Sequence, residues 1–351
     1  MTLLAAWYDI RDLSNAVTHL LEWVGDWGPS WLVYVLSAVI GGAAIFGFAA
    51  AGALINSWIE RRAIGRFQAR LGPNRVGPFG LLQPFADVLK LMLKEPLFPR
   101  LLERWLFVLA PIVVFIPAVM VFGVFPFGPG MTFVDLNVGV VYVLAISSLG
   151  VIAVFMAGWS SANKFSLIGA LRAAAQLIAY ELPMVLASAA IVMQAGTMSL
   201  VGISEAQWQM WYVVYQPIGF LIFMIAVFAE LSRPPFDMPV ADSEIIFGAY
   251  TEYSGLKFAF FLLAEYGGIV VMTAIASVLY LGGYQPLRGL EMIPGPLWMM
   301  GKIFALSFVV IWVRVTFPRL REDQLQRFTW LWLTPLALLQ ILGVAYFKVA
   351  F

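Results

Sequence analysis

The chain has 351 residues, of which 62% are hydrophobic and 12% are charged, and its formal net charge at pH 7 is +1. A mean hydropathy of +0.89 is typical of a protein that crosses the membrane several times and is far from that of a soluble domain. There is no cysteine and only one histidine, His19, which excludes disulfides, an iron-sulfur ligand set and a haem or zinc site. Neither a Walker-type loop nor a GxGxxG loop occurs, so nucleotide chemistry is not indicated.

The first segment, residues 1–28, does not have the pattern of a signal peptide. It lacks a basic start and contains Asp9, Asp12, Glu22 and Asp26. Apolar residues recur in it at helical spacing, namely Ile10, Leu13, Val17, Leu20, Leu21 and Val24. This spacing predicts a short amphipathic helix on the membrane surface, and a frayed terminus is the alternative.

Eight apolar segments are long enough to cross a bilayer, which takes about 20 residues in a helix. They lie near residues 31–58, 104–126, 138–158, 168–194, 212–232, 258–282, 297–317 and 328–350. No repeat or low-complexity segment occurs. We therefore expect an all-α, polytopic integral membrane protein with about eight transmembrane helices plus interfacial amphipathic helices, in which residues 29–351 form a single membrane domain.

Most of the 21 Lys and Arg residues follow the first, third, fifth and seventh spans. Because cytoplasmic loops hold the basic excess, this distribution places both termini outside and the two long charged loops, 59–103 and 233–257, in the cytoplasm. Long ordered loops usually carry function.

The first of these loops contains a candidate interfacial helix at residues 81–94. One face is polar, with Gln83, Asp87, Lys90 and Lys94. The other face is apolar, with Leu81, Phe85, Val88, Leu89, Met92 and Leu93. Such a helix is too short to cross the bilayer, so we expect it to lie at the cytoplasmic interface.

Ionisable groups inside spans are costly and usually mark ion or proton paths. Glu181 and Glu265 lie within the fourth and sixth spans, and Glu230 ends the fifth, with Arg233 one turn further on. The alternative for each is an ion pair that serves packing, and it is strongest for Glu230 at a helix end. Lys302, in the seventh span, is either their counter-charge or a residue that reaches the interface. A carboxyl group at low dielectric can exchange protons near neutral pH, which makes a proton relay physically natural.

Four stretches resemble the H-type membrane subunits of NADH:quinone oxidoreductase, respiratory complex I. They are ERRAIGRFQARLGPNRVGPFGLLQPFADVLKLMLKE (60–95), SLIGALRAAAQLIAYE (166–181), AELSRPPFDMPVADSE (229–244) and TEYSGLKFAFFLLAEY (251–266). The resemblance covers nearly the whole chain after residue 30.

This resemblance implies a subunit at the heel of the complex, where the membrane arm meets the hydrophilic arm. Its first span and interfacial helix would help to enclose the chamber for a quinone, which is the substrate. FMN, NAD and iron-sulfur clusters would lie only in partner subunits. The implied partners are the hydrophilic subunits of the quinone site, small membrane-arm subunits and membrane lipid, with no nucleic acid. The implied location is the bacterial cytoplasmic membrane or an equivalent energy-coupling membrane.

The resemblance also assigns roles to individual residues. The quinone-binding set is Glu60, Arg61, Arg62, Phe67, Asp87 and Lys90. The proton-coupling set is Glu181, Glu230, Arg233, Asp242, Glu244, Glu252 and Glu265. In the Gly- and Pro-rich loop QARLGPNRVGPFGLLQP (68–84), Arg70, Asn74 and Arg75 would dock on the hydrophilic arm, and contact with anionic lipid is the alternative for these arginines.

Two positions depart from the family pattern, which usually has an acidic residue where this chain has Val240 and often one where it has Ser148. A proton relay in this chain would therefore have two carboxylates fewer, and Asp242, Glu244 or water would have to compensate. One alternative function is a homologous subunit of a complex fed by ferredoxin or of a membrane-bound hydrogenase, and the intact loop 59–103 favours the quinone reductase. A stand-alone ion transporter is a further alternative, which needs no long docking loop.

Overall fold

The computed structural model describes residues 30–240, 242–287 and 292–350, and throughout these ranges the secondary structure is helical, without strands. This confirms the all-α class expected from the sequence. The amphipathic helix predicted in residues 1–28 lies outside the described residues.

Seven helical segments among the described residues are long and apolar enough to cross a membrane. They are α3 (Ser30–Phe67), α5 (Arg104–Met120) with η3 (Val121–Val124), α6 (Gly139–Ser147) with α7 (Leu149–Ser160), α8 (Lys164–Ala195), α13 (Gly255–Tyr280), α14 (Gly295–Thr316), and α15 (Glu322–Phe328) continued by η5 (Thr329–Leu333) and α16 (Thr334–Ala350). These segments account for seven of the expected spans and are those of a polytopic membrane protein.

The segment expected as the fifth span, 212–232, is divided into a one-turn helix, α10 (Tyr212–Tyr215), and α11 (Pro217–Glu230). Pro217 occupies the first turn of α11 and lacks the amide hydrogen that would continue the preceding turn. The 14 residues of α11 extend about 21 Å. This is less than the roughly 30 Å of bilayer hydrocarbon, so α11 is an apolar helix of less than full span length.

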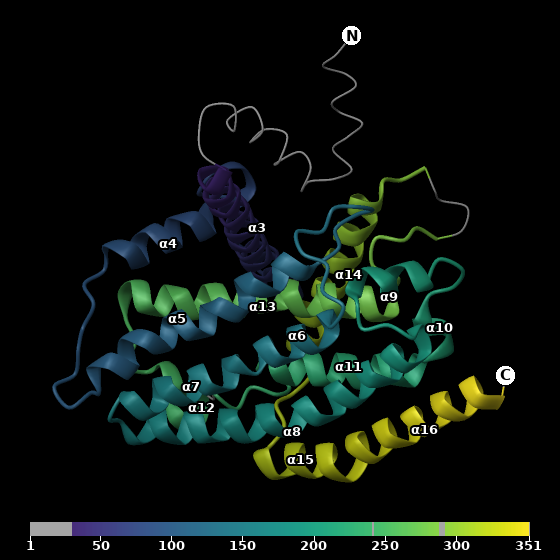
Figure 1. Cartoon of the computed structure of the whole chain (residues 1–351). Helices are drawn as coiled ribbons and strands as arrows, with labels where there is room; N and C mark the ends of the chain where they lie inside the picture. Colours follow the sequence, from purple (N-terminus) through teal and green to yellow (C-terminus); the bar gives the residue numbers. More distant parts are fainter. Residues whose placement is uncertain (1–29, 241, 288–291, 351) are drawn as a thin grey trace.

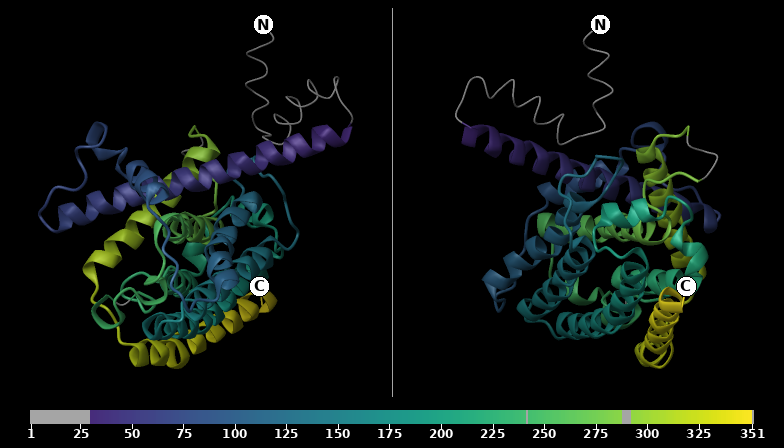
Figure 2. Two further views of the ribbon diagram at one scale, coloured as in Figure 1. Left: turned by 90° about the vertical axis from the view of Figure 1, so that its left-hand side faces the viewer. Right: turned by 45° about the vertical axis from the view of Figure 1, so that its right-hand side comes forward.

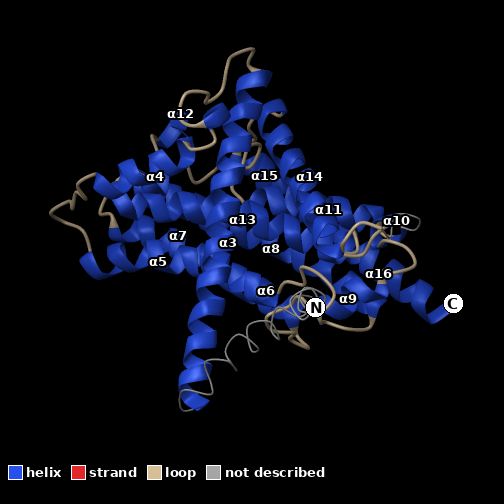
Figure 3. Ribbon diagram, turned by 90° about the horizontal axis from the view of Figure 1, so that it is seen from above, coloured by secondary structure: helices blue, strands red, loops and turns tan. Residues whose placement is uncertain are grey.

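The long helices form a bundle with α3 on one side and α16 on the opposite side (Figures 1 and 2). α8 packs against α7, α11 and α16, whereas α13 packs against α3, α5 and α14. The N-terminal part of α3 projects beyond the bundle (Figure 3), and Val39 there is 62% exposed. The centre of the bundle is the second half of α13, where every residue from Ile269 to Tyr280 is buried. A helix that is buried on all sides needs no polar face.

The interfacial helix predicted at 81–94 is present as α4 (Gln83–Leu93), preceded by the short helix η2 (Pro78–Gly80). α4 packs against α3 and α13. The side chains of Asp87 and Leu91 line a pocket between α3, α4 and α13. Four apolar side chains of α4 stay exposed, namely Phe85, Leu89, Met92 and Leu93. The carboxylate of Asp87 faces the protein because its ion-pair partner, Arg61, lies on α3.

Lys302 on α14 has a role that sequence reasoning left open. Its Nζ donates to three backbone carbonyls, those of Leu281 (2.6 Å), Gly283 (2.7 Å) and Gln285 (2.8 Å), and lies 4.3 Å from the ring centre of Trp211. The charge is therefore held by the carbonyl groups that follow α13, and it is not a counter-charge for Glu181, Glu230 or Glu265.

Candidate functional site

Four charged residues from separate parts of the chain meet in what we call the Arg233 cluster: Arg233, Glu60, Glu265 and Arg314. The Nη1 of Arg233 lies 2.9 Å and 3.1 Å from the two carboxylate oxygens of Glu60, and its Nη2 lies 3.0 Å from Oε1 of Glu265. Arg314 forms a further ion pair with Glu60. The cluster thus joins α3, the segment after α11, α13 and α14.

Burial makes this cluster unusual. Arg233 and Glu60 are each only 2% exposed, whereas the side chain of Glu265 is 37% exposed. The guanidinium of Arg233 also lies 4.8 Å from the ring centre of Tyr266, a favourable cation-π position. Two arginines and two glutamates balance their charges. Removing one member of a buried pair leaves an uncompensated charge, which costs about 3–5 kcal/mol.

Backbone contacts fix the position of Arg233. α11 ends at Glu230, and Gln176 of α8 donates from Nε2 to the carbonyls of Ala229 (2.7 Å) and Phe236 (2.8 Å). Gln176 is 1% exposed. One buried amide therefore clamps both ends of the turn that carries Arg233.

A second polar contact attaches α4 to α3. Arg61, next to Glu60 in the sequence, forms an ion pair with Asp87, which also accepts a hydrogen bond from Gln83 (3.2 Å). Lys90 lies 4.0 Å from Asp87 and is 71% exposed. A pocket of about 50 Å³ lies between α3, α4 and α13, lined among others by Arg61, Asp87 and Tyr266. Because Tyr266 also contacts Arg233, this pocket and the Arg233 cluster share a wall.

Arg62 does not join the Arg61–Asp87 contact and instead binds the loop that follows α3. Its Nη1 donates to the carbonyl of Phe79 (3.0 Å), and its guanidinium lies 5.4 Å from the ring centre of Trp58 and 5.7 Å from that of Phe79. The remaining candidates of this region are exposed, namely Phe67, Arg70, Asn74 and Arg75. Arg70 donates from Nε to the neighbouring Gln68 (2.8 Å).

A separate cavity of about 140 Å³ has Glu265 in its wall. Its lining includes Glu230 from the end of α11, Glu265 from α13, and Val240 and Tyr250 from the loop 233–257. This volume is enough for several water molecules. Glu181 on α8 lies near enough to Glu230 for the two negative charges to repel each other. Val240, the first departure from the family pattern, thus lines the same cavity as Glu230 and Glu265.

The other departure, Ser148, lies at the break between α6 and α7 and donates from Oγ to the carbonyl of Ala145 (2.8 Å).

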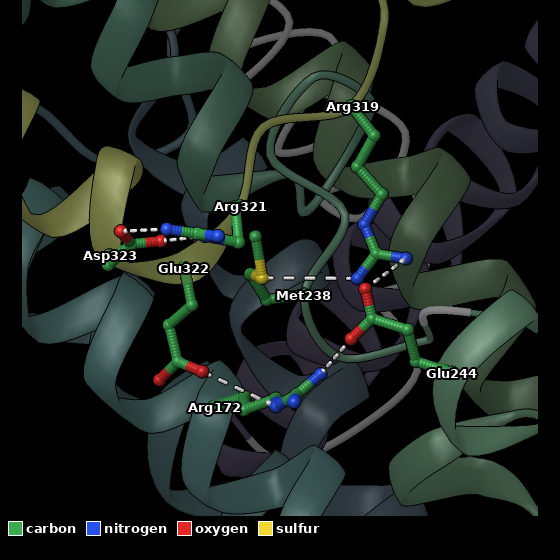
Figure 4. Close-up of polar contacts among 7 residues, drawn as sticks. All are labelled: Arg172, Met238, Glu244, Arg319, Arg321, Glu322 and Asp323. Carbon is green, nitrogen blue, oxygen red and sulfur yellow. Dashed lines mark hydrogen bonds and ion pairs between the residues drawn. The ribbon is translucent and has the colours of Figure 1, made fainter.

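Glu244, predicted to belong to the coupling route, lies in another ion-pair network (Figure 4). Its carboxylate is 2.5 Å from Nη1 of Arg172 and 3.8 Å from Nη1 of Arg319, and Arg172 also pairs with Glu322 at 3.3 Å. The hydrogen bond from Arg172 lowers the pKa of Glu244. This network fastens α12 (Asp242–Ile245) to α8 and to the start of α15.

Of the predicted coupling residues in this loop, Glu252 also lies away from the Arg233 cluster. Glu252 accepts a hydrogen bond from Nδ2 of Asn163 (2.6 Å), the residue that caps the N-terminus of α8. Asp242 is the first residue of α12, and its side chain lies outside the described part of the structure. The structure therefore brings Glu60, Arg233 and Glu265 into direct contact. Glu230 lines a cavity together with Glu265, whereas Glu244 and Glu252 make separate contacts of the loop.

Sequence reasoning missed several residues of this site, chiefly Arg314, Tyr266, Tyr250 and Gln176. Arg314 stands at the end of an apolar helix, where a basic residue usually reaches the interface, so its pairing with Glu60 gives no signal in the sequence. Tyr266 follows Glu265 directly, and that adjacency was the one available hint. Among the described residues, no group of three or more His, Cys, Asp or Glu side chains is placed to hold a metal ion.

Comparison with known proteins gives extensive matches. The sequence pattern of the NADH dehydrogenase family matches residues 40–345. An H-type subunit of NADH-quinone oxidoreductase from Bacillus cytotoxicus is 47% identical over 336 residues, covering 95% of this chain and 99% of the relative. H-type subunits of the same enzyme from Geobacillus kaustophilus and Dehalococcoides mccartyi are each 46% identical, covering 94% and 90% of this chain and 98% and 87% of the relatives.

Proposed function

The chain belongs to the NADH dehydrogenase family as an H-type membrane subunit of NADH-quinone oxidoreductase, and on this premise we propose that it couples quinone reduction to proton translocation through the Arg233 cluster. The observation that carries the proposal is that one buried arginine contacts both Glu60 and Glu265. Glu60 belongs to the quinone side, and Glu265 lines the cavity that also contains Glu230.

On the quinone side, we propose that Glu60, Arg61, Arg62, Phe67, Asp87 and Lys90 form part of the chamber. The pocket between α3, α4 and α13 measures about 50 Å³, whereas sites for small molecules usually measure about 300–1,000 Å³. The chamber therefore needs further walls, which hydrophilic partner subunits supply above α4. The exposed residues Arg70, Asn74 and Arg75 are placed to contact those partners.

On the coupling side, the cluster converts a change of charge into a change of protonation. Negative charge that develops on the quinone during reduction attracts the Arg233 guanidinium away from Glu265. A carboxylate that loses its neighbouring cation binds a proton more readily. Glu265 then takes up a proton from the cavity, and Glu230 and Glu181 lie next along the route. Glu244 and Glu252 act in this scheme by holding the loop 233–257 in place, and Asp242 stays a proposed member of the coupling set.

The same proposal covers location and assembly. Residues 29–351 form one membrane domain in an energy-coupling membrane, the bacterial cytoplasmic membrane or its equivalent, with loops 59–103 and 233–257 on the cytoplasmic side. The basic excess in these loops supports this orientation. The partners are the hydrophilic subunits of the quinone site and the small subunits of the membrane arm, and FMN, NAD and iron-sulfur clusters belong to the hydrophilic partners.

The test uses the complex that co-purifies with a tagged version of this chain, assayed for NADH-driven, inhibitor-sensitive quinone reduction. Arg61→Ala should lower that activity by roughly tenfold or more, because it misplaces α4, while NADH oxidation by an artificial acceptor continues. Glu265→Gln should lower the number of protons moved per electron. Full quinone reduction by Arg61→Ala, or normal coupling in Glu265→Gln, would contradict the respective half of the proposal.

A further inference from the structure

The cavity beside the Arg233 cluster contains two carboxylates that belong to different elements, Glu265 of α13 and Glu230 of α11. A proton that passes from one to the other needs a group between them that can donate and accept hydrogen bonds. Most of the lining is apolar, and Val240 occupies a position on the wall that offers no such group. The hydroxyl-bearing residues of the lining are Ser147, Ser232 and Tyr250.

Tyr250 is held firmly in this position. It ends the short helix η4 (Gly248–Tyr250), and its ring lies 4.7 Å from that of Phe261, at an angle of 44°. Gly248 has φ of +50° and abuts the carbonyl of Pro239, so a side chain there would collide with the backbone. The amide of Ala249 also donates to the carbonyl of Pro239 (3.4 Å). These contacts keep Tyr250 in the wall of the cavity, which Val240 also lines.

The chemistry of Tyr250 suits a relay. Burial, with smaller contributions from the nearby Glu265, Tyr253 and Asp237, raises the pKa of its phenol, so the hydroxyl stays protonated at neutral pH. A neutral hydroxyl donates one hydrogen bond and accepts others. Of the other hydroxyls, that of Ser147 already donates to the carbonyl of Leu144 in its own helix (2.8 Å).

We propose that the Tyr250 hydroxyl relays protons between Glu265 and Glu230 across the cavity. In one transfer, protonated Glu265 gives its proton to the phenol oxygen while the phenol gives its own proton to the Glu230 carboxylate. One proton leaves Glu265, one arrives at Glu230, and the tyrosine is unchanged. The inference rests on the proposed coupling function and adds to it a group that is not a carboxylate.

The experiment compares three variants in the purified complex. Tyr250→Phe removes the hydroxyl and keeps the ring. Tyr253→Phe is the matched control, because Tyr253 is a buried tyrosine of the same loop, stacks on Phe107 at 4.1 Å, and lies outside the lining of the cavity. Glu265→Gln tests the coupling function itself. Each complex is reconstituted in liposomes and assayed for quinone-reductase kcat and KM, protons moved per electron, and the solvent deuterium isotope effect.

For Tyr250→Phe we expect the coupled kcat to fall by about tenfold, below the usual contribution of an acid–base group because water in the cavity replaces part of the relay. The KM for quinone should stay unchanged, and the isotope effect should rise. Tyr253→Phe should behave as the unaltered complex.

Loss of coupling in Glu265→Gln together with normal behaviour of Tyr250→Phe would overturn the relay and leave the proposed function standing. Normal coupling in both variants would overturn the proposed function as well. An equal loss in Tyr253→Phe would show that the effect is one of packing, and the relay would again be rejected.

Discussion

Arg233 and Glu60 are 173 residues apart in the chain, yet their side chains meet in two hydrogen bonds of 2.9 and 3.1 Å, and each residue is 2% exposed. The pair connects the first long helix of the described chain to the turn that follows α11. Arg233 also contacts Glu265. A change of charge at either glutamate therefore alters the electrostatic environment of the other through one guanidinium. This arrangement gives the clearest expectations for experiment.

The first prediction concerns stability of the buried pair. Arg233→Met should destabilise the chain by about 3–5 kcal/mol, because Glu60 loses its buried partner and is left with Arg314 alone. The measurement is thermal unfolding of the purified complex together with its yield. The loss of stability in the double variant Arg233→Met, Glu60→Met should be smaller than the sum of the losses in the two single variants, by about 0.5–3 kcal/mol. Additive losses would show that the two side chains are not energetically coupled.

The second prediction concerns the partly exposed pair of Arg61 and Asp87, whose side chains are 41% and 23% exposed. Asp87→Asn should change stability by no more than about 1 kcal/mol, as is usual for solvent-screened pairs. It should nevertheless raise the KM for quinone, because Asp87 lines the pocket between α3, α4 and α13. Arg100→Ala, in an exposed part of the same loop, is the control. An unchanged KM in Asp87→Asn would remove this pair from the quinone chamber.

The third prediction concerns pH and the contact of Glu244 with Arg172. Since the pKa of Glu244 is lowered in the folded protein, the contact stabilises α12 fully above the ordinary value of 4.5 and is lost as pH falls through the lowered pKa. Arg172→Gln should therefore speed amide exchange in α12 at pH 7, by no more than about fivefold for a half-exposed carboxylate. Below the lowered pKa of Glu244, the exchange rate in the variant should approach the rate in the unaltered protein.

Arg321→Gln is the control for this measurement, because Arg321 pairs with its neighbour Asp323. A ratio of the two exchange rates that stays constant as pH falls would show that the Arg172 contact does not depend on the charge of Glu244.

The fourth prediction separates structure from coupling at Lys302. Lys302→Met fits the site sterically but leaves three backbone carbonyls without their donor, and each unsatisfied buried group costs about 1–3 kcal/mol. Assembly and thermal stability should fall, while protons moved per electron stay normal in the complex that remains. Lys348→Met is the matched control, because Lys348 is exposed and donates to a single carbonyl, that of Met193. Loss of coupling at normal stability would show that the charge of Lys302 contributes to proton transfer.

The sequence was sufficient for the helical class, the long apolar helices and the amphipathic α4, because hydropathy and 3.6-residue periodicity act locally. It also identified most of the charged residues of the candidate site, since ionisable groups in apolar segments are rare enough to stand out. It placed a full span at 212–232, whereas Pro217 divides that segment into α10 and the short α11. Hydropathy averaged over a window does not register one missing amide hydrogen.

Which of those charges meet was decided by the tertiary structure alone. Pairing depends on the rotation and crossing of helices, so Glu60 and Arg61, adjacent in sequence, face different partners on α14 and α4. For the same reason Arg314 enters the Arg233 cluster, Lys302 pairs with backbone carbonyls and not with the buried glutamates, and Glu244 belongs to a loop contact. The sequence by itself determined which segments are helical and which residues are charged, because those properties are local. Packing determined which charges neutralise one another, because a Coulomb interaction depends on distance in space.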